Sequence, residues 1–160
     1  MDLPDYSSAS LEHIVEKYTD LLLRITFIQM KQMQDAEDIT QEVFVRLIEH
    51  KPVFESDEHM KAWLIRVALN LCRDHWKSAW YKRNVPLNDN LASFPPEVSD
   101  ILQTVMQLPA ASRQVVLLHD YVGYSLVEIA SMTGQKISAV TTRLHRARKK
   151  LRMMLEPPIL

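Results

Sequence analysis

The chain has 160 residues, of which 47% are hydrophobic and 24% are charged, and its net charge is -1. This composition excludes a disordered chain and fits one ordinary domain or two small ones. The most apolar stretch, LLLRITFI, contains Arg24 and is too short to cross a bilayer, so we expect no membrane insertion. The single cysteine, Cys72, excludes an internal disulfide and favours a cytoplasmic protein.

Charge is distributed unevenly along the chain. The net charge is -8 over residues 1–60, +5 over 61–83, -4 over 84–134 and +6 over 135–160. Two basic blocks therefore alternate with two acidic ones. This alternation indicates a polyanion that is held at two places and a second partner that meets the acidic surface. For one block taken alone, ordinary solvated surface charge explains the clustering equally well.

Two helices are predicted before Pro52. Apolar residues at helical spacing predict the first over 10–31, with Ser10 as its N-cap. The second begins near Asp35, where acidic side chains favour the positive end of the helix dipole, and Pro52 follows its end. The spacing of its apolar residues predicts that it buries Ile39, Val43 and Leu47, and also Phe44 and Ile48.

A long third helix is predicted from Asp57 to Lys82. Two apolar stripes run along it, and Cys72 and Trp76 lie on the second stripe, where we expect them to be core residues. A helix that is apolar on two sides is buried on two sides, so we expect it at the centre of a small bundle. A polar strip separates the stripes, with residues spaced by four, three and four: Arg66, Asn70, Arg73 and Lys77.

The composition of the sequence changes over residues 84–98. This segment contains three prolines and three asparagines, and its apolar residues show no sustained helical spacing. This segment is typical of a flexible linker. The sequence therefore predicts an all-α chain with two small helical domains, at 1–83 and 99–160. Short helices are expected over Val98–Gln107 and then after Ser112, which can cap the second of them.

The C-terminal segment has the pattern of a helix-turn-helix. Ser125 and Glu128 form a capping box, Gly134 suits the left-handed end of that helix, and Ser138 can cap the last helix. Apolar residues at spacings of four, three and four pack inward, which leaves a polar and then basic outer face. That face is suited to base edges at its start and to phosphates later. Its candidate DNA-binding residues are Ser138, Ala139, Thr141, Thr142, Arg143, Arg146, Lys149 and Lys150. An amphipathic helix pair with a solvated basic face is the other interpretation.

Three blocks of the sequence resemble one family. LPAASRQVVLLHDYVGYSLVEIASMTGQKISAVTTRLHRARKKL resembles the promoter-reading C-terminal domain of bacterial sigma-70 family factors. DAEDITQEVFVRL is similar to the helix of that family that docks on the polymerase clamp, and AWLIRVALNLCRDHWKS is similar to its promoter-melting helix. The resemblance covers about residues 11–152. The chain has room only for the second and fourth conserved domains of the family, as in the extracytoplasmic-function (ECF) group.

The resemblance implies a transcription initiation factor that binds core RNA polymerase and promoter DNA, and that an anti-sigma factor commonly holds inactive. The helix that begins near Asp35 would meet the polymerase clamp through Asp38, Ile39, Gln41, Glu42, Val45 and Arg46. The -10 element would be bound by Arg66, Asn70, Arg73, Lys77, Trp80, Tyr81, Lys82 and Arg83. Aromatic rings beside cations suit single-stranded DNA, although Trp80 and Tyr81 fit a core role equally well. The last helix would read the -35 element.

No enzyme is expected, because the sequence has no phosphate-binding glycine loop, no H-E-x-x-H and no nucleophile elbow. Its six histidines show no ligand spacing, so we expect no catalytic residue, metal or cofactor. Two other functions stay open. One is a helix-turn-helix regulator whose N-terminal bundle dimerises or senses a ligand, and the other is a helical interaction module without a DNA role. Only the initiation factor explains D-x-x-Q-E followed by a basic, aromatic helix.

Overall fold

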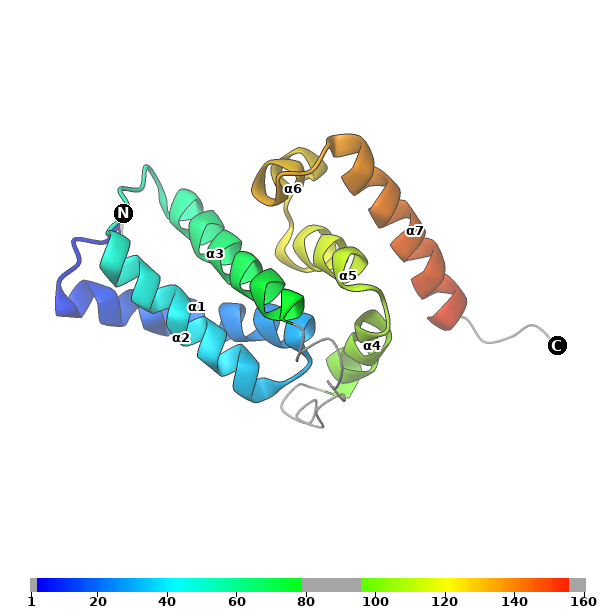
Figure 1. Cartoon of the computed structure of the whole chain (residues 1–160), viewed down its shortest axis with the longest axis horizontal. Coiled ribbons are helices and arrows are strands. Elements are labelled where there is room, and N and C mark those ends of the chain that lie inside the picture. The colour runs from blue at the N-terminus through cyan, green and yellow to red at the C-terminus, as the bar shows by residue number, and fades with distance from the viewer. Residues whose placement is uncertain (1–2, 79–95, 156–160) are drawn as a thin grey trace. The chain divides into compact units, whose positions relative to one another are not determined.

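The computed structural model describes residues 3–78 and 96–155, and the regular elements in these two ranges are all helices (Figure 1). This confirms the predicted all-α fold with two helical domains. The chain divides into two compact units, Met1–Asn88 and Asp89–Leu160, and the division lies within the segment predicted as a linker. No helix among the described residues is long and apolar enough to cross a membrane.

The first unit is a bundle of α1 (Ser8–Met30), α2 (Met33–His50) and α3 (Asp57–Lys77), in which each helix packs against the other two. The C-terminal part of α1 is its centre, because every residue from Ile25 to Met30 is buried. The prediction that α3 would be central was therefore wrong. Both apolar stripes of α3 do pack inward, but its polar strip faces outward and keeps one side of the helix in water.

Helix ends differ from the prediction where several serines compete for one cap. Ser7, not Ser10, caps α1, since the Ser7 hydroxyl accepts the Ser10 N–H at 3.2 Å. The Ser10 hydroxyl instead accepts the Asp5 N–H at 3.3 Å.

The third helix also ends earlier than predicted, at Lys77, because Ser78 has an extended backbone with ψ of 133°.

Side chains from distant parts of the chain fix the bundle. The Trp76 indole N–H donates to the Gln29 carbonyl at 3.0 Å, which joins the end of α3 to the end of α1. Trp76 is half-buried, so its predicted core position is only partly realised. Cys72 is 3% exposed, and burial raises the pKa of its thiol to about 12. Cys72 is therefore a core residue, as predicted. It is also unreactive, because the thiolate form is absent at neutral pH.

The second unit contains α4 (Pro96–Met106), α5 (Ala110–Val116), the π-helix η2 (Leu117–Val122), α6 (Leu126–Thr133) and α7 (Ile137–Leu155). Helices α4, α5 and α6 all pack against α7. The fourth helix begins two residues before the predicted Val98. Ser112 was predicted to cap α5, but it does not. The helix already begins after Pro109, whose carbonyl accepts the Arg113 N–H at 2.9 Å.

A buried arginine joins α4 to α5. Arg113 is 2% exposed, and its Nη1 donates to the carbonyls of Met106 at 3.2 Å and Leu108 at 3.0 Å. These carbonyls lie at the end of α4, where the helix leaves its last acceptors without partners of its own. Arg113 therefore serves as a C-terminal cap from another helix, a role that its position in the sequence did not reveal.

Candidate functional site

The predicted helix-turn-helix is formed by α6, a short turn and α7. The Ser125 hydroxyl accepts the Glu128 N–H at 3.1 Å, as predicted for the N-cap, and the Glu128 carboxylate accepts from the same hydroxyl at 3.1 Å. Gly134 has φ of 68°, and its N–H closes α6 on the Ala130 carbonyl, also as predicted. Val140, Leu144 and Ala147 are buried, so the apolar spacing correctly identified the inner side of α7.

The start of α7 differs from the prediction. The helix begins at Ile137, with the Val140 N–H bonded to the Lys136 carbonyl at 3.1 Å, so Ser138 lies within the first turn and is not its N-cap. Ile137 is half exposed, and the sequence analysis did not select it. The hydroxyls of Thr141 and Thr142 donate to carbonyls one turn earlier, at 2.8 and 2.9 Å, so both side chains are held close to the helix.

The outer side of α7 carries most of the residues predicted to bind DNA. The exposed members are Ser138, Ala139, Thr141, Thr142, Arg146, Lys149 and Lys150. Arg143 is half-buried, and its Nη1 is enclosed without a hydrogen-bond partner among the described residues. Another cation of α7, Arg148, pairs with Asp120 of η2 at 2.5 Å. Apart from Ile137, the exposed side chains of α7 are therefore small at its start and basic further along, as far as Arg152.

The polar strip of α3 forms a second exposed surface. Arg66, Arg73 and Lys77 are exposed and Asn70 is half-exposed, all on one side of the helix. Spacings of four, three and four residues keep such positions within one face, since an α-helix has 3.6 residues per turn. The remaining residues predicted to bind the -10 element lie outside the described part of the chain: Trp80, Tyr81, Lys82 and Arg83.

A third surface lies along α2. Asp38, Gln41 and Val45 are exposed, and Glu42 and Arg46 are half-exposed. Ile39, also predicted to meet the polymerase clamp, is 1% exposed and belongs to the core. That assignment was wrong, because Ile39 shares the inner side of α2 with the other buried residues of the helix.

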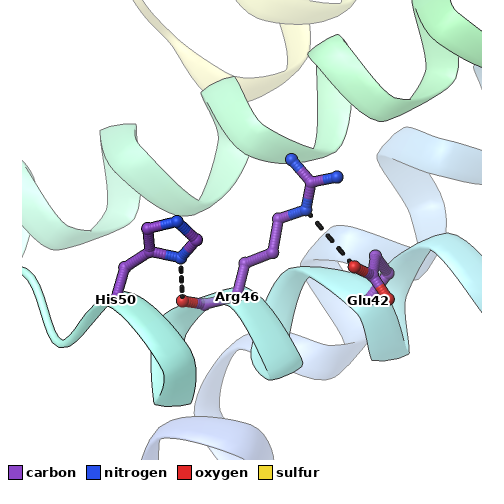
Figure 2. A network of polar contacts seen from close by, with 3 residues as sticks. All are labelled: Glu42, Arg46 and His50. Carbon is purple, nitrogen blue, oxygen red and sulfur yellow. Dashed lines mark hydrogen bonds and ion pairs between the residues drawn. The ribbon is translucent and has the colours of Figure 1, made fainter.

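Polar contacts along α2 order this surface, as Figure 2 shows. Arg46 Nε lies 3.3 Å from Glu42 Oε1, and His50 Nδ1 donates to the Arg46 carbonyl at 3.0 Å. The Asp38 carboxylate accepts from Gln34 at 3.2 Å. Ile48 was predicted to be buried, but it is 47% exposed on α2, so that prediction was wrong. Val53, an apolar residue that was not predicted, lies past the helix end and is 90% exposed. Acidic and apolar groups side by side are suited to a protein partner.

Histidines and acids in the described part of the chain show no arrangement that would hold a metal. Among the residues that the structure describes, no group of three His, Cys, Asp or Glu side chains could hold one. Several histidines bond the backbone instead. His59 Nδ1 accepts the Glu55 N–H at 3.1 Å, and His119 Nδ1 donates to the Tyr124 carbonyl at 2.8 Å.

Comparisons with known proteins match one region of a family in each unit. Residues 14–81 match the family described as "Sigma-70 region 2", and residues 99–151 match "Sigma-70, region 4". RNA polymerase sigma factor NccH of Alcaligenes xylosoxydans xylosoxydans is 31% identical over 137 residues, which cover 76% of this chain and 74% of NccH. ECF RNA polymerase sigma factor SigW of Bacillus subtilis is 27% identical over 162 residues, covering 89% and 87% of the two chains.

A solved structure of similar fold covers both units. The structure of CnrH in complex with the cytosolic domain of CnrY matches with a TM-score of 0.70 and 28% identity, over 93% of this chain and 89% of CnrH. The regulator interpretation, with its sensing bundle, does not explain why residues 14–81 match a sigma region as well. The chain belongs to the sigma-70 family of RNA polymerase sigma factors, in its ECF group.

Proposed function

We propose that this sigma factor divides promoter recognition among three separate surfaces. Helix α7 binds the -35 duplex, the polar strip of α3 captures the -10 element, and the exposed side of α2 binds the clamp of core RNA polymerase. The observation that carries the proposal is the segregation of exposed charge. Cations lie outward on α3 and α7, whereas the exposed side of α2 mixes acids with apolar groups.

The -35 surface follows from the chemistry of α7. A recognition helix places its first residues at base edges in the major groove, and Ser138, Ala139 and Thr142 are small enough for close approach there. Lys149 and Lys150 follow in the later turns, where cations neutralise phosphates. Arg146 lies between these two regions and is available for either contact.

The -10 surface follows from the polar strip of α3 and the sequence after it. Arg66, Arg73 and Lys77 provide a line of positive charge along the helix, and Asn70 adds hydrogen-bonding groups. Trp80 and Tyr81 follow in the sequence. Cations that track the backbone, with rings on which bases stack, are the features of single-strand binding.

The clamp surface on α2 gives the acidic part of the chain a protein partner, because DNA would repel it. The solved structure of CnrH contains the cytosolic domain of CnrY, and the structure of RpoE from Bartonella quintana contains the anti-sigma factor NepR. We infer that an anti-sigma factor also regulates this chain. The chain acts in the cytoplasm, where polymerase and promoters meet, and it acts by binding and not as an enzyme.

Replacing Arg66, Asn70 and Arg73 together with alanine is expected to lower promoter melting about tenfold, because the single strand loses its phosphate contacts. Permanganate reactivity of unpaired thymines in the holoenzyme–promoter complex measures this loss. Lys61→Ala is the matched control, since it removes a cation from a different side of α3. Affinity for core polymerase should stay unchanged in both variants. Melting equal to that of the unaltered chain would remove the -10 role from the strip.

A further inference from the structure

The cations of α7 are not equivalent. Arg148 Nη2 lies 2.5 Å from Asp120 Oδ1, and the two side chains are 50% and 39% exposed. The partners are 28 residues apart, so this contact joins two elements of the fold. Four other cations of α7 are exposed and form no ion pair with a described residue: Arg146, Lys149, Lys150 and Arg152.

Asp120 lies in a π-helical turn that a glycine with positive φ closes. It lies in η2, and the N–H groups of Gly123 and Tyr124 both bond the Leu118 carbonyl, at 3.1 and 2.9 Å. Gly123 has φ of 98°, which glycine adopts at little cost. His119 closes the same turn through the Tyr124 carbonyl. Such π-helical turns are rare and often lie at functional sites, and this one holds a carboxylate beside α7.

The pair marks one flank of α7. Arg146 and Lys150 each lie two residues from Arg148, and two residues turn an α-helix by roughly 200°, so they project on its other side. A carboxylate beside a DNA phosphate is repelled. The flank that contains Asp120 is therefore unsuited to face the duplex, whereas Arg146 and Lys150 form no ion pair with an acid of the described residues.

We propose that Asp120 and Arg148 form a positioning pair, which fixes α7 against η2 and directs the opposite side of the helix toward DNA. Arg148 is then a positioning residue and contacts no phosphate, although it lies in the middle of the basic cluster. This inference rests on the proposed function of α7 in binding DNA.

The test uses the full chain and a short duplex of mixed sequence, with fluorescence anisotropy over a range of salt concentrations. Arg148→Gln and Asp120→Asn should each weaken binding by up to about fivefold, the range of an exposed ion pair, and leave the dependence on salt unchanged. The double variant should be no weaker than either single one, because both remove the same interaction. Exchanging the two residues, as D120R with R148D, should restore affinity.

Lys150→Gln is the control for a phosphate contact, and it should reduce the slope of log K against log salt by about 1. The proposal is overturned if Arg148→Gln reduces the slope by the same amount while Asp120→Asn tightens binding. Urea unfolding of Arg148→Gln, Asp120→Asn and their double variant separates this result from a failure of the proposed function. If the unaltered chain binds no duplex, the proposed function of α7 fails. The pair is then judged by the unfolding free energies alone: losses that do not add in the double variant support it, and losses that add reject it.

Discussion

Replacing Gln41 with alanine and Val45 with glutamate together is expected to lower the affinity for core RNA polymerase about thirtyfold. Both side chains are exposed on α2, where Gln41 lies between the ordered carboxylates of Asp38 and Glu42 and Val45 lies one turn after Glu42. A hot-spot residue near the centre of an interface contributes about 2 kcal/mol or more, which corresponds to roughly thirtyfold in affinity. Neither side chain is part of the core, so the stability of the chain should change by less than about 0.5 kcal/mol.

Titration of a labelled chain with core polymerase measures this loss, and Val15→Glu is the control. Val15 lies on α1 and is 39% exposed, close to the 42% of Val45, so it places the same charge on an equally accessible valine. The control should bind core polymerase normally. Equal losses in both variants would mean that added negative charge, and not the side of α2, determines the binding.

The second large effect concerns stability. Arg113→Ala should lower the free energy of unfolding of the second unit by about 3 kcal/mol, since it removes two charge-assisted hydrogen bonds and a buried side chain. The carbonyls of Met106 and Leu108 would lose their donor at the end of α4. Arg113→Lys should recover only part of the loss, because an ammonium cannot reproduce the planar fork of the guanidinium.

Two spectroscopic signals separate the units in this experiment. All three tryptophans, Trp63, Trp76 and Trp80, lie in the first unit, so their fluorescence follows that unit alone, whereas circular dichroism follows both. Arg113→Ala should shift part of the dichroism transition to lower urea and leave the fluorescence midpoint in place. Arg146→Ala, an exposed arginine of the second unit, should shift neither signal. An unchanged dichroism curve for Arg113→Ala would contradict the capping role.

Local chemistry made the helix-turn-helix predictable from sequence. Ser125, Glu128 and Gly134 act on neighbours within a few residues, and the spacing of Val140, Leu144 and Ala147 determines which side of α7 is buried. The serine caps were less predictable. Ser10, Ser112 and Ser138 satisfy the local rule for an N-cap, yet each lies inside a helix that begins earlier. The preference of serine for the N-cap shows that a helix starts nearby, but contacts with the surrounding residues determine at which residue the helix begins.

Contacts between distant residues set the limits of the sequence analysis for the candidate surfaces. The bond from Arg113 to the end of α4 and the pair of Asp120 with Arg148 depend on how helices pack, and no periodicity in the sequence contains that information. Ile39 is different, because its spacing with Val43 and Leu47 already indicated burial. The resemblance to a clamp-binding helix includes residues on both sides of α2. The fold then shows which of these residues are accessible and which are buried in the core.

The most direct test of the account is a reconstitution. The purified chain is mixed with sigma-free bacterial core RNA polymerase and a library of promoter fragments, and the transcripts are sequenced. We expect defined start sites that appear only with the chain and disappear with the Gln41→Ala, Val45→Glu double variant, while aligned start sites reveal a -35 and a -10 element. Unchanged transcripts and no binding to core polymerase, from a chain that remains folded, would contradict the account.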